Sequence, residues 1–268
     1  MNSRAVYFVS DHTGVTAEVL GHSLLARFAD VAIRTTTRPF VNTLQRADAL
    51  AVELAGLPET AVVFSTITDE AVRQRIAAAP CVHLDLFEPF LGELSAVFGR
   101  PPQDRVGAFH GIRDLATYQA RIDAVEYALA TDDGSNVTRY GHAEVVMIGV
   151  SRVGKSPTCL YLALQYGVRA ANYPLAEDDF EKEGLPAPLA PFRNRLFGLT
   201  IAPERLHEFR QKRRPDSGYA DVRRCAYEVR QAERLFRRHG VPFQDASSLS
   251  VEELAALVLQ RAGLERHR

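Results

Sequence analysis

The chain has 268 residues, of which 46% are hydrophobic and 24% are charged, an ordinary globular composition that favours two modest domains over one large core. Its 32 lysines and arginines nearly cancel its 33 aspartates and glutamates, which excludes an overall field that would draw the protein to nucleic acid or to an anionic membrane. The three cysteines are odd in number and far apart, which argues against a disulfide framework or a zinc site and fits a reducing cytosol.

The first part of the chain alternates predicted strands with predicted helices. Strand and helix ranges follow in the order 5–9 and 15–28, 31–37 and 43–55, 61–65 and 69–78, and 81–84 and 87–98. Parallel strands need crossover helices, so this order predicts a parallel sheet with flanking helices. No stretch approaches the ~20 apolar residues that span a bilayer, and a strand pattern begins near residue 5 in place of a signal sequence. We therefore expect a cytoplasmic protein.

A polar segment after a predicted helix over residues 118–130 separates this series from a second one. We place the domain boundary there, which gives an amino-terminal α/β domain of residues 1–136 and a second domain of residues 137–268. The second domain is predicted to contain strands at 144–150, 168–173 and 196–201 and helices at 155–166, 203–212, 219–239 and from 251 onward. The fold class is thus α/β, with an amino-terminal parallel sheet followed by a P-loop kinase-like α/β domain.

The second domain contains a complete phosphate-binding loop, with the pattern G-x-x-x-x-G-K-[S/T]. Its residues are Gly149, Val150, Ser151, Arg152, Val153, Gly154, Lys155 and Ser156. This spacing lets successive backbone N–H groups surround an anion, and the two glycines keep Cβ atoms out of its way. An apolar strand precedes the loop and a helix follows it, which is the context that a nucleotide-binding loop requires. A chance match in a surface loop is the alternative, and that context argues against it.

Within the loop, Lys155 is the predicted catalytic cation that reaches the terminal phosphates, and Ser156 is the predicted ligand for Mg²⁺. P-loop proteins usually add a carboxylate from another strand, for which Asp178 and Asp179 are the nearest candidates. A solvated helix start explains these two acids about as well. Arg210, Arg213 and Arg214 are candidate phosphate ligands that could neutralise a transferring phosphoryl group, with a solvated helix end as the alternative for each.

The amino-terminal domain offers a second candidate site where its first strand ends and its first helix begins, the place where open parallel sheets bind ligands. Asp11 is the candidate general base, and Ser10 and Thr13 are candidate phosphate ligands in the same loop. The alternative is that these side chains only cap the helix, as Ser, Thr and Asp often do. Both interpretations remain open on the sequence alone.

Several strings in the chain resemble one family of regulatory enzymes. They are Val9–Glu18, the phosphate loop continuing into Pro157-Thr158, Arg169–Pro174, Leu196–Ile201 and Arg213–Ser217. Together they resemble the bifunctional kinase/pyrophosphorylase regulators of pyruvate, phosphate dikinase and phosphoenolpyruvate synthase, over nearly the whole chain. The Asn-Tyr-Pro-Leu form at residue 172 favours the synthase-directed branch. The family often has glycine where this chain has His12. This departure weakens the amino-terminal site if a ligand there needs close backbone approach, whereas the imidazole could equally add a titratable donor for phosphate.

The resemblance implies two opposed reactions on one threonine of phosphoenolpyruvate synthase, close to the histidine that carries the phosphoryl intermediate of that enzyme. ADP would be the donor for a serine/threonine protein kinase reaction that inactivates the target. Inorganic phosphate would accept the phosphoryl group in a reaction that restores activity and forms pyrophosphate. The family's nucleotide-binding loop corresponds to Gly149–Ser156. A small-metabolite kinase and a nucleotide-gated binding module are the competing interpretations, and a homodimer is compatible with the sequence, which leaves the oligomeric state open.

Overall fold

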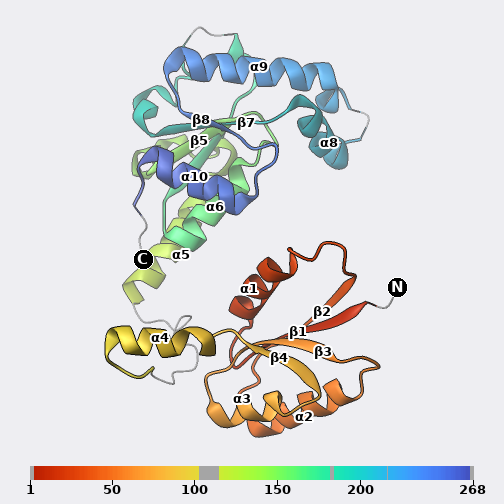
Figure 1. The fold of residues 1–268 in the computed structure, drawn as a ribbon. Coiled ribbons are helices and arrows are strands. Elements are labelled where there is room, and N and C mark those ends of the chain that lie inside the picture. The colour runs from red at the N-terminus through yellow and green to blue at the C-terminus, as the bar shows by residue number, and fades with distance from the viewer. Residues whose placement is uncertain (1–2, 103–114, 182–183, 216, 266–268) are drawn as a thin grey trace. The chain divides into compact units, whose positions relative to one another are not determined.

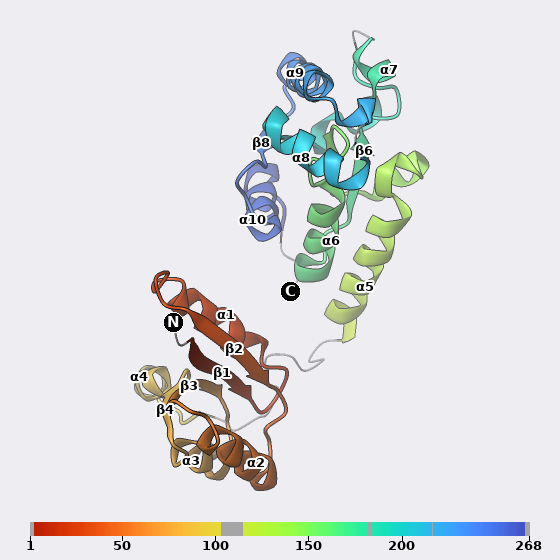
Figure 2. The same ribbon diagram turned by 90° about the vertical axis from the view of Figure 1, so that its right-hand side faces the viewer.

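Alternating strands and helices build two parallel sheets, as the sequence predicts. The computed structural model describes residues 3–102, 115–181, 184–215 and 217–265. The chain divides into two units, Met1–Gly111 and Ile112–Arg268, and each unit has one four-stranded sheet with helices against it (Figures 1 and 2). Every described strand pair is parallel. The predicted α/β class is therefore confirmed.

The first unit has the strand order β2-β1-β3-β4. Its elements are β1 (Arg4–Ser10), α1 (Val15–Leu25), β2 (Ile33–Arg38), α2 (Leu44–Ala55), β3 (Ala61–Thr66), α3 (Glu70–Ala77), β4 (Cys81–Asp85) and α4 (Glu88–Phe98). Alternate residues of β1 feed separate cores on the two faces of the sheet: Tyr7 and Val9 pack with α2 and α3, whereas Val6 and Phe8 pack with α1. Figure 1 shows α1 on one face and α2 and α3 on the other.

The second unit has the strand order β6-β5-β7-β8. Its main elements are α5 (Leu115–Ala130), β5 (Val145–Gly149), α6 (Lys155–Tyr166), β6 (Ala170–Pro174), α7 (Glu177–Phe180), β7 (Leu196–Thr200), α8 (Pro203–Arg213), α9 (Val222–His239), β8 (Phe243–Asp245) and α10 (Val251–Ala262). Short 3-10 turns include η1 (Asp132–Gly134) and η4 (Gly218–Ala220). Figure 1 shows α6 and α10 on one face of this sheet and α9 on the other.

The strand β5 is central in its sheet and fully buried along its length. Helices cover both faces of the sheet, so β5 consists of a continuous apolar run instead of an alternating pattern. Its neighbours β6 and β7 run parallel to it, and the carboxyl ends of all three strands meet at one edge. The loop after β5 therefore opens at the edge where parallel sheets bind ligands.

The division between the units differs from the predicted boundary after residue 136. The helix α5 packs against α6 and β6, and Ala124, Tyr127 and Ala128 belong to the core of the second unit. This helix therefore belongs with the phosphate-loop sheet instead of ending the first domain. In the part of the chain that the structure describes, no helix combines the length and the apolar character needed to cross a membrane.

Candidate functional site

The predicted phosphate loop joins the end of β5 to the start of α6, and two glycines fix its path. A side chain at Gly149 would place its Cβ 2.5 Å from the carbonyl oxygen of Leu199 on the neighbouring strand. Gly154 is the N-cap of α6 and has a φ of 101°, a conformation that glycine adopts readily. No side chain caps this helix, so its first N–H groups remain available for an anion.

Lys155 is the first residue of α6, and its side chain is buried at 4% exposure. Its Nζ donates a hydrogen bond to the carbonyl oxygen of Val150, at 2.9 Å. Burial lowers the pKa of Lys155 from 10.5 to about 8, and nearby Arg210 acts in the same direction, whereas the carboxylates of Asp133 and Asp132 oppose the shift. A desolvated ammonium gains strongly from a new anionic partner, which suits the predicted role of Lys155.

A cavity of about 800 Å³ lies over the loop, a volume in the range of small-molecule sites. Its lining residues are Ser151, Arg152, Gly154, Lys155, Ser156 and Pro157 from the loop side, Phe209, Lys212, Arg213, Arg214 and Tyr219 from α8 and the segment after it, and Asp133 from η1. We call the stretch Lys212–Arg214 the basic rim. Cations on both walls make the cavity suitable for a polyphosphate.

The structure separates the three predicted arginines into two groups. Arg213 and Arg214 line the cavity and are exposed, as a phosphate ligand requires. Arg210 is fully buried, and its guanidinium is hydrogen-bonded to Glu228 and to backbone carbonyls. The prediction that Arg210 is a phosphate ligand is therefore corrected. Its place on the inward side of α8 commits both of its Nη groups to other protein atoms.

The predicted acids after β6 do not line this cavity. Asp179 is an N-terminal capping acid of α7, because its Oδ2 accepts a hydrogen bond from the backbone of Ala176 at 3.0 Å, and its Oδ1 accepts one from the hydroxyl of Tyr173 at 3.3 Å. Asp178 lies in the same short helix and is exposed. The structure instead places Asp133 in the cavity together with Ser156. The helix-start alternative for Asp178 and Asp179 describes their position better than the metal-ligand prediction.

Asp133 is not among the site residues predicted from the sequence, because the polar segment 131–136 has the composition of a domain boundary. A buried asparagine of β6, Asn172, holds the turn η1 in place. Its Oδ1 accepts from the backbone N–H of Asp133 at 3.1 Å, and its Nδ2 donates to Asp132 at 2.6 Å. Asp133 has a φ of 48° and a ψ of 36°, in the left-handed region that Asp tolerates better than most residues. The Asp-Asp-Gly string was the available signal.

The amino-terminal loop lies in the first unit, at the carboxyl end of β1. Asp11 is buried, and its Oδ2 accepts hydrogen bonds from the backbone N–H and the hydroxyl of Thr68, at 2.8 and 2.7 Å. Asp11 therefore ties the loop after β1 to the loop after β3. Both of these bonds use Oδ2 and neither uses Oδ1.

The capping alternative for this loop does not describe it. Gly14 is the N-cap of α1, and no side chain caps that helix. The hydroxyl of Ser10 accepts instead from the backbone N–H of His12, at 3.1 Å, and the ring of His12 meets the ring of Phe40 edge to face. Thr13 is exposed. Ser10, Asp11 and Thr13 thus share one loop, and their functional roles stay predictions.

Comparison with known proteins gives consistent similarities along the chain. The family described as kinase/pyrophosphorylase matches residues 6–259. A protein of Deinococcus radiodurans is 49% identical over 96% of this chain and 94% of its own length. Proteins of Azoarcus sp. strain BH72 and of Halorhodospira halophila are 45% and 46% identical, each over 98% of this chain and over 97% and 98% of their own lengths. All three carry the provisional name of phosphoenolpyruvate synthase regulatory protein.

Proposed function

This chain belongs to the kinase/pyrophosphorylase family, and from that premise we propose that it regulates phosphoenolpyruvate synthase by reversible phosphorylation of a threonine. The observation that carries the proposal is the cavity in which Lys155, Ser156 and the basic rim converge on the start of α6. This arrangement suits the transfer of a phosphoryl group between two anionic or polar partners. The names of the relatives support phosphoenolpyruvate synthase as the protein substrate.

In the inactivating direction, ADP is the proposed donor. The target threonine hydroxyl gives its proton to a general base while its oxygen attacks the β-phosphorus, the bond between that phosphorus and the bridging oxygen breaks, and AMP leaves. Lys155 and the N–H groups at the start of α6 would hold the phosphates, while Arg213 and Arg214 would balance the charge of the group in transfer. Because a P-loop alone does not fix the length of the polyphosphate, the basic rim is our candidate for selecting ADP over ATP.

In the activating direction, inorganic phosphate is the proposed acceptor. An oxygen of phosphate attacks the phosphorus of phosphothreonine, the bond from phosphorus to the threonine oxygen breaks, and pyrophosphate forms while the threonine oxygen takes up a proton. Both directions need the same kind of surroundings, with several cations around two adjacent phosphorus centres. The cations that line this cavity come from the phosphate loop and from the basic rim and supply such surroundings, which supports the proposal.

A Mg²⁺ ion fits the oxygen groups of the cavity. The hydroxyl of Ser156 and the carboxylate of Asp133 both line it, and Mg²⁺ is usually held by one or two protein oxygens together with substrate phosphates and water. When bound, the ion would neutralise phosphate charge. We propose Ser156 and Asp133 as its protein ligands. Asp11 remains our proposed general base, and its Oδ1 is the oxygen that Thr68 leaves out of both hydrogen bonds.

Incubation of the purified protein with intact phosphoenolpyruvate synthase and ADP tests the proposal. The target is supplied with and without the phosphoryl group on its catalytic histidine, and threonine phosphorylation is followed by mass spectrometry. A regulatory kinase modifies the target. A small-metabolite kinase leaves the target unmodified and consumes nucleotide with a small acceptor. A nucleotide-gated binding module binds the target in the presence of ADP and transfers nothing, and either of the last two results would refute the proposal.

A further inference from the structure

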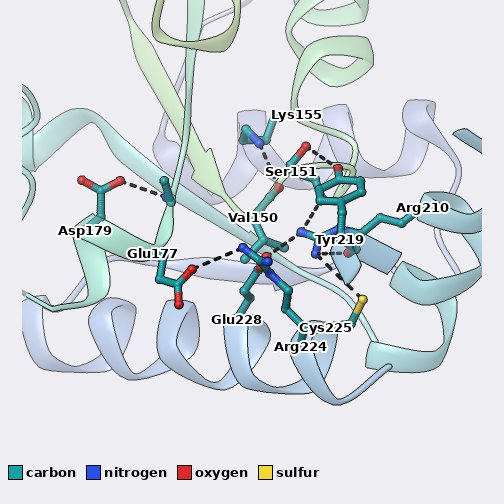
Figure 3. A network of polar contacts seen from close by, with 11 residues as sticks. Val150, Ser151, Lys155, Glu177, Asp179, Arg210, Tyr219, Arg224, Cys225 and Glu228 are labelled. Carbon is teal, nitrogen blue, oxygen red and sulfur yellow. Dashed lines mark hydrogen bonds and ion pairs between the residues drawn. The ribbon is translucent and has the colours of Figure 1, made fainter. Parts of the chain in front are cut away.

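Arg210 makes an unusual set of contacts for a fully buried side chain. Figure 3 shows its guanidinium between the phosphate loop, the ring of Tyr219 and the helix α9. Its Nη2 donates to the carbonyl oxygen of Ser151 at 3.2 Å and to the carboxylate of Glu228 at 2.6 Å. Its Nη1 donates to the carbonyl oxygen of Tyr219 at 3.1 Å. The two backbone carbonyls belong to segments that are far apart in the sequence.

These two segments form different parts of the lining of the phosphate cavity, which we call its two walls. Ser151 belongs to the loop wall, and Tyr219 lies in η4, just after the basic rim. Two further contacts join the same walls: the hydroxyls of Ser151 and Tyr219 are hydrogen-bonded at 2.8 Å, and the guanidinium of Arg210 lies 4.2 Å from the centroid of the Tyr219 ring. One planar side chain with several fixed donors therefore holds both walls.

The charge of Arg210 is balanced from a third element. Glu228 of α9 pairs with Arg210 and also with Arg224, at 2.9 Å, and Arg224 reaches Glu177 of α7 at 3.3 Å. Burying an ion pair gives little or no stability over an apolar pair of the same size. An apolar side chain, however, could not donate to carbonyls on two walls, which an arginine fork does. This difference favours a role beyond packing.

We propose that Arg210 is a positioning residue that fixes the basic rim relative to the phosphate loop. Lys155 and the N–H groups of α6 would bind the donor phosphates on one wall, and Arg213 and Arg214 would act on the transferring group from the other. Arg210 contacts neither the donor phosphates nor the transferring group. It sets the distance between the side chains that contact them. The inference rests on the proposed phosphotransfer in this cavity.

The test uses a double variant in which both buried charges are removed, Arg210→Met with Glu228→Gln. No unpaired charge is left buried, and the glutamine can still accept from Arg224, so the protein should fold with a melting temperature close to that of the wild type. We expect ADP affinity, measured by calorimetry, to change by less than about threefold, because the loop and Lys155 remain. We expect kcat to fall by about 10- to 100-fold, since misplacement of a catalytic group by about 1 Å has an effect of this order.

Two single variants and a control complete the test. Arg210→Lys keeps the charge beside Glu228 but lacks the planar fork, so it should also lower kcat with little change in ADP affinity. Tyr219→Phe keeps the ring and loses only the hydroxyl contact with Ser151, and it should lower kcat less. The control, Arg237→Met, breaks an exposed ion pair with Glu233 on α9, outside the residues that line the cavity, and should leave both quantities unchanged.

The outcomes separate this inference from the proposed function. If the wild-type protein transfers no phosphoryl group, the proposed function fails whatever the variants do. If the wild type is active and the folded double variant and Arg210→Lys keep wild-type kcat, Arg210 has no positioning role. A loss of ADP affinity as large as the loss of kcat would also overturn the inference, because Arg210 would then support binding in general. Should the double variant not fold, Arg210→Lys and Tyr219→Phe decide the question by the same comparison.

Discussion

Replacement of Lys155 by methionine should raise the stability of the ligand-free protein while it abolishes phosphotransfer. Methionine has a similar length and flexibility but no charge, so it fits the buried position of Lys155. The charged lysine at this position destabilises the folded protein, because burial lowers its pKa from 10.5 to about 8. Each unit of pKa corresponds to about 1.4 kcal/mol, so the protonated lysine costs the folded state about 3 kcal/mol.

The pH dependence of this effect has a definite sign. Below pH 8 the lysine is protonated in both the folded and the unfolded chain, and the full cost applies. Between about pH 8 and 10.5 the folded chain releases the proton while the unfolded chain keeps it, so the cost declines as pH rises. Methionine also loses the hydrogen bond to Val150, worth about 1 kcal/mol. The variant should therefore be more stable by about 2 kcal/mol at pH 7 and should lose this advantage near pH 10.

Denaturant unfolding of both proteins at pH 7 and pH 10 measures the difference. Phosphotransfer by the folded variant should be undetectable, since the missing cation faces the phosphates in the proposed function. A gain in stability that accompanies loss of activity is typical of residues kept for function. Equal stability at pH 7, or a stability difference that does not change with pH, would refute the assignment of a desolvated cation. Near-wild-type transfer by the variant would refute its proposed role.

Four other substitutions test further site residues. Asp133→Asn keeps the size of the side chain and removes its charge, so the Mg²⁺ concentration required for half-maximal transfer should rise by at least about tenfold; an unchanged requirement would exclude Asp133 as a ligand. Arg213→Ala and Arg214→Ala should each lower kcat by about 100-fold without loss of thermal stability, and kcat equal to that of the wild type would make the basic rim an ordinary solvated helix end. Asp11→Asn should lower kcat in both directions by about 100-fold if Asp11 is the base. The amide oxygen of the asparagine is a weaker acceptor for Thr68 than the carboxylate, so the unfolding free energy should fall by about 1–2 kcal/mol. Destabilisation with unchanged kcat would leave Asp11 with a structural role only.

Most strands and helices were predictable because their periodicity and their end signals are local. The apolar run of β5 and the glycine pattern after it predicted the strand, the loop and the start of α6 correctly. The strand β8 was not predicted, because Phe243–Asp245 is too short to show a period. The helix α5 was predicted, but it was assigned to the first domain. It belongs to the second unit, which only its packing against α6 shows.

The site was predictable in the phosphate loop, which is one continuous stretch, and at Arg213 and Arg214, which line the cavity as expected. The cavity also depends on which side of a neighbouring helix each residue occupies. Arg210 and Arg213 are three positions apart in α8, yet one is buried and the other is exposed at the cavity. Asp133 reaches the cavity through a turn that Asn172 holds from another strand. Long-range placement of this kind leaves little trace in local sequence.

The donor of the phosphoryl group tests the central claim most directly. ADP labelled in its β-phosphate is incubated with the protein and phosphoenolpyruvate synthase in the presence of an adenylate kinase inhibitor, and a parallel reaction contains γ-labelled ATP. We predict that label from ADP appears on a target threonine in step with the formation of AMP, while ATP transfers poorly. Label that stays on ADP while γ-labelled ATP modifies the target readily would contradict the account, because the chain would then be an ordinary ATP-dependent kinase.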